Sequence, residues 1–137
     1  MSRMEGWEAR LGDTIERARS RSYKIGEHDC FRVACEVVEA LTGVDRWSEW
    51  QGRYSTEREA LRLLAAHGHS FESAGDKFFG VARCAPRLAQ RGDIVAFRAA
   101  NGTKHLGVCM GEKTAVTSAE GLAFVGTLEA LCAWRIG

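Results

Sequence analysis

The segment from Tyr23 to Cys30 ends in a cysteine, and an amphipathic segment begins at that same residue. Unpaired backbone N–H groups and the helix dipole stabilise an anion in the first turn of a helix. A thiol in that position is biased toward the thiolate, which is the nucleophilic form of cysteine. Cys30 is therefore a candidate nucleophile for covalent catalysis.

A thiol nucleophile needs a proton acceptor, and histidine is the usual one because its pKa lies near neutral pH. His28 lies on a connector, and His67 and His69 follow a predicted helix in a polar stretch. His105 opens a predicted strand, which holds an imidazole rigidly, and Gly107 on the same face leaves room for another element to approach. We expect His105 to be the base. The alternative for a histidine on a strand is a half-buried residue with a satisfied hydrogen bond.

The same residue types leave a zinc site open as a further alternative, although no spacing matches a zinc knuckle. Its candidate ligands are His28, Cys30, His67, His69 and Cys84. We predict neither a metal nor a cofactor. The five cysteines form no CxxC pair, and their odd number favours free thiols over a disulfide framework. We expect the other four to be small buried hydrophobic residues, namely Cys35, Cys84, Cys109 and Cys132.

The spacing of apolar residues predicts helices in the first half of the chain and strands in the second. The predicted helices span 6–19, a segment from Cys30 between an Asp29 cap and Gly43, and a segment from Thr56 to Gly68 with a Thr56/Glu59 capping box. The predicted strands span 94–97, 105–110, 114–117, 122–125 and 133–136. This order predicts an α+β fold in one domain over residues 1–137. An insertion at about 47–86 is hard to place, and we expect it to be irregular beyond the third helix.

Composition excludes some classes of partner. Of the 137 residues, 45% are hydrophobic and 27% are charged, and the formal net charge is +1. Such a balance creates no bulk field for nucleic acid or for an anionic membrane. The N-terminus lacks an apolar segment typical of a secretory signal, and no stretch has the apolar length of a membrane span. We expect a protein made in the cytoplasm without a signal peptide, with no nucleic-acid partner and no membrane insertion.

Three motifs resemble those of the NlpC/P60 cysteine peptidases. Residues 23–30, Tyr-x-x-Gly-x-x-Asp-Cys, resemble the motif around the nucleophile of that family. Residues 91–97, Arg-Gly-Asp-Ile-Val-Ala-Phe, resemble its "GD-hydrophobic-V-x-F" strand. Residues 105–111, His-Leu-Gly-Val-Cys-Met-Gly, resemble its strand with the catalytic histidine. The three blocks occur in the order of the family, and the resemblance covers most of the chain outside about 47–86.

The resemblance implies a papain-like fold, in which a helix with the cysteine packs on an antiparallel sheet with the histidine. By motif position, Cys30 is the nucleophile, His105 is the general base and acid, and the hydroxyl of Tyr23 helps to polarise the scissile carbonyl. A backbone N–H at or beside Cys30 would stabilise the oxyanion.

The third catalytic position departs from the family, which usually has His, Asn or Gln there. Alignment of Gly111 places Thr117 at this position. A hydroxyl can accept a hydrogen bond from the Nδ1 atom of histidine, but it fixes the tautomer less firmly than a carboxylate or an amide. The sequence therefore leaves two alternatives, a dyad with a weak orienting group and a scaffold without activity.

NlpC/P60-like enzymes usually cut peptidoglycan stem peptides near γ-D-glutamyl bonds. Segments 41–43, 52–54 and 134–136 make this chain resemble most the stand-alone domains in tail modules of siphophages and gene transfer agents. The resemblance implies a murein endopeptidase on a virion tail, where it would open the cell wall during DNA delivery. Its partners would be the peptidoglycan stem peptide and tail hub or tail-tip proteins. A non-catalytic structural module of the tail tip and a thiol amidase or acyltransferase on the same fold are the alternatives.

Overall fold

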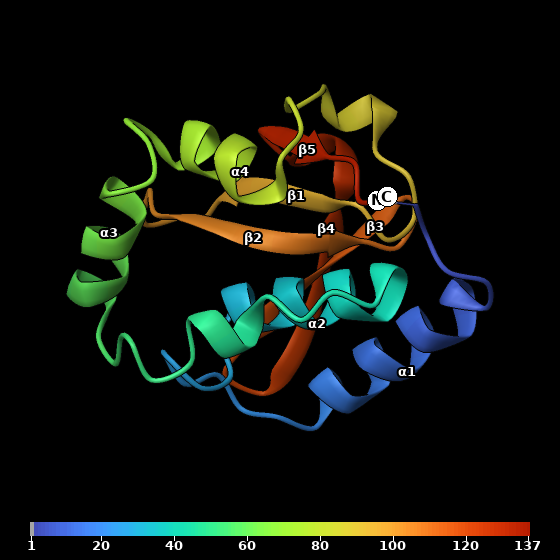
Figure 1. Ribbon diagram of the computed structural model, residues 1–137, viewed down its shortest axis with the longest axis horizontal. Coiled ribbons are helices and arrows are strands. Elements are labelled where there is room, and N and C mark those ends of the chain that lie inside the picture. The colour runs from blue at the N-terminus through green and yellow to red at the C-terminus, as the bar shows by residue number, and fades with distance from the viewer. Residues whose placement is uncertain (1) are drawn as a thin grey trace.

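In the computed structural model, which describes residues 2–137, helices precede strands along the chain. The helices are α1 (Trp7–Arg19), α2 (Cys30–Thr42), α3 (Glu57–Ala65) and α4 (Phe71–Phe79), with 3-10 turns η1 (Trp47–Glu49), η2 (Pro86–Leu88) and η3 (Thr127–Glu129). The strands are β1 (Ile94–Arg98), β2 (Lys104–Cys109), β3 (Lys113–Ser118), β4 (Gly121–Gly126) and β5 (Cys132–Trp134). This arrangement confirms the predicted α+β class (Figure 1). Within residues 2–137 we find no helix that combines the length and the apolar character needed to cross a membrane.

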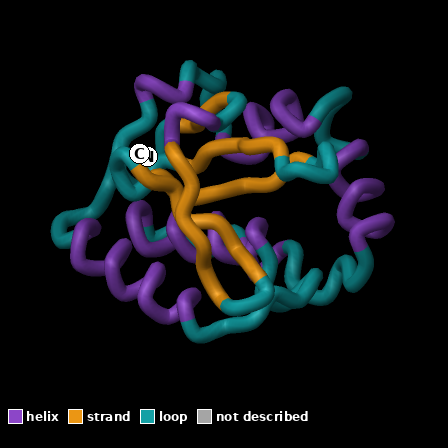
Figure 2. Tube along the Cα trace, turned by 180° about the vertical axis from the view of Figure 1, so that it is seen from behind, coloured by secondary structure: helices purple, strands orange, loops and turns teal. Residues whose placement is uncertain are grey.

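The five strands form an antiparallel sheet in the order β4-β3-β2-β1-β5. β1 and β2 pair along their whole length, from Ile94 opposite Val108 to Arg98 opposite Lys104. β2 and β3 pair only at Val108–Ala115 and Cys109–Thr114, and beyond these pairs β3 continues with β4. Figure 2 shows the β3–β4 hairpin diverging from β1 and β2. The divergence leaves one backbone edge of β2 without a strand partner.

Different parts of the chain pack on the two faces of the sheet. Leu106 and Val108 of β2 belong to the main core with residues of α1 and α2. Cys109 lies in a second cluster on the opposite face, below the loop residues Cys84 and Ala89. Because side chains alternate along a strand, His105 and Gly107 share the face of Cys109. The predicted alternation along this strand is confirmed.

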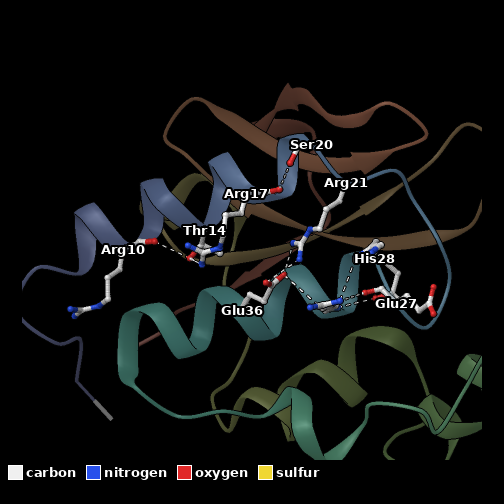
Figure 3. A network of polar contacts seen from close by, with 10 residues as sticks. Arg10, Thr14, Arg17, Ser20, Arg21, Glu27, His28 and Glu36 are labelled. Atoms are coloured by element: carbon white, nitrogen blue, oxygen red, sulfur yellow. Dashed lines mark hydrogen bonds and ion pairs between the residues drawn. The ribbon is translucent and has the colours of Figure 1, made fainter.

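Helices α1 and α2 pack against each other through an apolar interface with polar contacts at its margin (Figure 3). The guanidinium of Arg21, just beyond α1, donates to both carboxylate oxygens of Glu36, at 2.6 and 3.2 Å. The Arg10 Nε atom donates to the backbone oxygen of Ala40 at 2.8 Å. These contacts fix α2, and with it Cys30, relative to α1.

The expectation that the chain is irregular beyond the third helix is wrong, because α4 forms there. Ser70 caps α4: its side chain accepts a hydrogen bond from the Ser73 N–H, and the Ser73 hydroxyl accepts one from the Ser70 N–H. In this capping box, serine replaces the usual Glu or Gln, so the sequence lacks the typical signature of a helix start at Ser70. The predicted caps at Asp29, Gly43 and Thr56 are confirmed.

A buried carboxylate ties both ends of the chain to the start of β1. Asp93 is fully buried and accepts hydrogen bonds from Arg3 Nη2 at 2.9 Å, from the Ile136 N–H at 3.1 Å and from the Gln90 N–H at 2.8 Å. Arg3 also donates to the backbone oxygen of Ile136 at 2.7 Å. Asp93, in the motif that resembles the "GD" strand, is therefore a structural residue.

We predict that Asp93→Asn lowers the free energy of unfolding by about 3 kcal/mol, because it leaves the Arg3 guanidinium without its buried counter-charge. Urea denaturation measures this change. Glu16→Gln is the control, since Glu16 pairs with Arg19 at 3.4 Å while both side chains are more than half exposed. The control should shift stability by less than about 1 kcal/mol. Equal losses in the two variants would contradict the structural role of Asp93.

Candidate active site

The turn before Cys30 is organised by the carboxylate of Asp29, which is 2% exposed. Its Oδ1 atom accepts the Arg32 N–H at 2.9 Å as the cap of α2. Its Oδ2 atom accepts the Gly26 N–H at 2.8 Å and the Tyr54 hydroxyl at 2.5 Å. Gly26 has φ +83°, and a Cβ there would collide with the backbone oxygen of Tyr54. This network confirms Asp29 as a cap and fixes the position of Cys30.

The Cys30 sulfur lies where β2 and β3 separate. The Leu131 N–H donates to the Ala96 oxygen at 2.7 Å, so the backbone polar groups of Ala96 face away from β2. Leu106 is directly opposite Ala96, and its N–H therefore faces the gap left by β3. This N–H donates to Cys30 Sγ at 3.5 Å. The start of α2 thus occupies the place that a continuing β3 would take.

Burial raises the pKa of the Cys30 thiol to about 11. The N–H groups of Leu106, Cys30 and Phe31 lower the pKa, and the nearby Asp29 carboxylate raises it further. The expectation that the helix start biases Cys30 toward the thiolate is therefore wrong for the free protein, because loss of hydration outweighs the hydrogen bonds. At neutral pH the thiol keeps its proton, and a nucleophilic Cys30 requires a base that removes this proton during attack.

His105 is held by a chain of hydrogen bonds within the turn before β2. Its Nε2 atom lies 2.8 Å from Thr103 Oγ1, which in turn lies 2.6 Å from Asn101 Oδ1. Asn101 Oδ1 also accepts the Thr103 N–H at 3.1 Å, so this atom is an acceptor and the Thr103 hydroxyl donates its hydrogen to it. Thr103 Oγ1 must then accept a hydrogen from His105 Nε2. In a neutral imidazole, this assignment places the hydrogen on Nε2 and leaves Nδ1 as the atom that can accept a proton.

Thr103 and Asn101 were missed by the sequence analysis, which treated Asn101-Gly102 only as a turn. The signal was present in the spacing: an asparagine side chain often bonds the backbone two residues on in a turn, and Thr103 in turn precedes His105 by two residues. The ring of Phe97 lies beside the imidazole, with centroids 5.7 Å apart.

A cleft of about 420 Å³ brings together three of the four predicted site residues. Tyr23, Cys30 and His105 line it, together with Thr103 and Glu57. Tyr23 is 36% exposed, and its N–H donates to the Ser118 oxygen at 3.3 Å. Partial burial, with smaller effects of Cys30, Asp29 and Glu57, raises the pKa of Tyr23 to about 12, so its hydroxyl remains a donor at neutral pH.

Thr117, the fourth predicted residue, is not among the residues that line this cleft. Cys109 is directly opposite Thr114, so His105 and Gly107 share the face of Thr114, and Thr117 points to the other face. A Cβ on Gly107 would lie 2.6 Å from Thr114 Cγ2, so the glycine makes room for β3 and not for α2. The structure therefore gives His105 the hydroxyl of Thr103 as its partner.

Among residues 2–137, no group of three or more histidine, cysteine, aspartate or glutamate side chains is arranged to hold a metal ion. All five cysteines are free thiols. Cys35, Cys109 and Cys132 are buried and Cys84 is half-buried.

The fold and the site define an α+β protein with a cysteine at a helix start and a histidine on the adjoining strand, on one cleft. The chain belongs to the family described as a domain of unknown function, DUF6950, which it matches over residues 2–136. No curated protein matches the chain.

Tyr54→Phe should lower the free energy of unfolding by about 1–3 kcal/mol, because it removes a donor from the buried carboxylate of Asp29. Chemical denaturation measures the loss. Tyr23→Phe is the matched control, since it removes a hydroxyl from a more exposed tyrosine beside the same turn. A loss in the control as large as in Tyr54→Phe would exclude a special role for the Asp29 network.

The rate of Cys30 alkylation by iodoacetamide should rise with pH and reach half its maximum near pH 11, because the raised pKa keeps the thiol protonated below that range. Peptide mass spectrometry at a series of pH values reports Cys30 separately from the other cysteines. Cys30→Ala identifies the modified peptide. A rate that levels off below pH 8 would mean that the helix start does produce a thiolate.

Proposed function

We propose that this protein is a cysteine peptidase with a papain-like NlpC/P60 fold that cleaves the stem peptide of peptidoglycan. The observation that carries the proposal is that Cys30 and His105 line one cleft while hydrogen bonds leave Nδ1 of the neutral His105 imidazole as the atom that can accept a proton. The packing of α2 against the strand that contains His105 supports the papain-like fold.

In the proposed reaction, His105 Nδ1 takes the proton of Cys30 as the sulfur attacks the scissile carbonyl carbon. The oxyanion of the tetrahedral intermediate accepts hydrogen bonds from the Cys30 N–H and from the Tyr23 hydroxyl. The intermediate collapses to a thioester, and the leaving amine takes the proton from His105. Water, deprotonated by His105, then attacks the thioester, which releases the carboxylic acid and restores the thiol.

The proposed setting is the tail tip of a phage or gene transfer agent, with tail hub or tail-tip proteins as partners. This part rests on the resemblance of segments 41–43, 52–54 and 134–136. A second candidate function is a non-catalytic module of the same tail tip. The raised pKa of Cys30 favours this candidate, because it makes the resting thiol a poor nucleophile.

Digestion of purified sacculi tests the proposal. We expect wild-type protein to release soluble muropeptides, Cys30→Ala to release none, and His105→Ala to be slower by about 10²–10⁴-fold. Chromatography of the soluble fraction provides the measurement. Identical product profiles for wild type and Cys30→Ala would rule out the peptidase and leave the structural module.

Two matched variants in the same assay separate the two candidate orienting residues. Thr103→Val removes the acceptor of His105 Nε2 and should slow digestion by on the order of tenfold and shift its pH profile, because the imidazole loses its fixed tautomer. Thr117→Val makes the same change on the other face of the sheet and should leave rate and profile within about twofold of wild type. The reverse order of effects would restore Thr117 as the third catalytic residue.

A further inference from the structure

A second cavity lies beside Cys30, and it is apolar. Its volume is about 140 Å³, and its walls are almost wholly carbon. Cys30 and Phe31 of α2, Leu64 of α3, and Phe71 and Ala74 of α4 contribute to its lining. His67 also lines it, but its Nδ1 atom already lies 2.8 Å from the backbone oxygen of Leu63. The cavity adjoins the cleft of Tyr23 and His105 along a shared wall that includes Cys30. The residues that line both spaces are Cys30, Phe31, Tyr54, Leu61, Leu64 and Phe71.

One side of the cavity is fixed to the sheet by α4. The Trp134 Nε1 atom donates to Asp76 Oδ1 at 2.8 Å, and Gly75 lets the Trp134 ring lie directly against the helix backbone. The Lys104 ammonium of β2 pairs with Glu72 at 2.6 Å. These contacts hold α4 against β5 and β2, so this wall is rigid.

The other side is formed by α3, where Ala60 and Leu63 pack at the margin of the small cluster of Cys35, Trp47 and Tyr54. None of the α3 side chains is buried, and Leu61 is 64% exposed. In a surface helix an apolar stripe normally packs on the core. Here Ala60, Leu63 and Leu64 line the cavity. On that side their side chains lack the contacts that a filled interior would provide.

We infer that this cavity binds an apolar group of the substrate, of the size of a leucine or phenylalanine side chain, on the acyl side of the bond that Cys30 attacks. Its size supports this ligand, since an apolar cavity of about 150 Å³ stays dry and binds benzene. Its position supports the role, because Cys30 lines both the cavity and the cleft that contains His105. The inference rests on Cys30 as the proposed nucleophile but goes beyond the proposed function, because a peptidoglycan stem peptide offers no apolar side chain of this size. It predicts a peptide or acyl substrate with one bulky apolar group.

Alkylation by matched iodoacetamides tests the cavity without enzyme activity. N-benzyl-iodoacetamide contains an apolar group that fits, and N-(2,3-dihydroxypropyl)-iodoacetamide contains a polar group in its place. At one pH, with the two rates each corrected for reaction with free cysteine, we expect the benzyl reagent to modify Cys30 at least tenfold faster. Equal corrected rates would overturn the inference.

Filled-cavity variants locate the effect. Leu64→Trp and Ala74→Leu each place extra carbon in the cavity and should reduce the preference for the benzyl reagent to within twofold. Arg58→Trp adds the same indole to an exposed position of α3 that is not among the lining residues, and it should keep the preference. Circular dichroism confirms that each variant is folded. A preference that survives in both filled variants would overturn the inference.

Binding of benzene to Cys30→Ala, followed by NMR, separates this inference from the proposed function. The variant has no nucleophile, so binding here tests the cavity alone, and we expect it to be lost in Cys30→Ala/Leu64→Trp. Benzene binding with no digestion of sacculi would keep the cavity and reject the peptidoglycan substrate. Digestion without benzene binding would keep the peptidase and reject the apolar subsite.

Discussion

The hydrogen bonds to the buried carboxylate of Asp29 are the constraint on which the rest of the site depends. One oxygen caps α2, and the other joins the turn at Gly26 to Tyr54, a residue of segment 47–86. A buried carboxylate that lost these donors would be costly, because it could not regain water. The Asp29 carboxylate therefore fixes the turn, the start of α2 and segment 47–86 relative to one another, and together they determine the position of Cys30.

The electrostatics of Cys30 follow from where that arrangement puts it. A helix start stabilises an exposed anion by only about 0.3–1 kcal/mol, whereas a buried charge without a counter-ion costs several kcal/mol. Because the sulfur lies in the gap between β2 and β3, loss of hydration wins and the thiol stays neutral. In the proposed reaction, Cys30 would therefore lose its proton to His105 only as it attacks, and the tautomer of His105 would matter more than a preformed ion pair.

The sequence predicted those features that depend on neighbouring residues. The bounds of α2 follow from Asp29 and Gly43, and the two faces of β2 follow from alternation. Thr117 was placed at the third catalytic position by alignment of Gly111. The face on which a strand residue lies depends on the register with the partner strand, and no local sequence pattern gives that register. The partial burial of Cys30 also depends on tertiary structure, because it arises where β2 and β3 separate. The helix dipole depends on α2 alone and is not affected by the strand that covers the sulfur.

Segment 47–86 contributes both to the position of Cys30 and to the apolar cavity beside it. Through Tyr54 it supports the turn that positions Cys30, and through α3 and α4 it forms the walls of the apolar cavity next to the sulfur. The cavity wall on α4 is tied to the sheet by Trp134 and Lys104, while the wall on α3 contains no buried side chain. Substitutions on α3 can therefore change the shape of the cavity at little cost in folding, because they remove few buried contacts. Under the proposed function, the cavity walls on α3 and α4 would select the substrate group, while α2 and β2 contain Cys30 and His105.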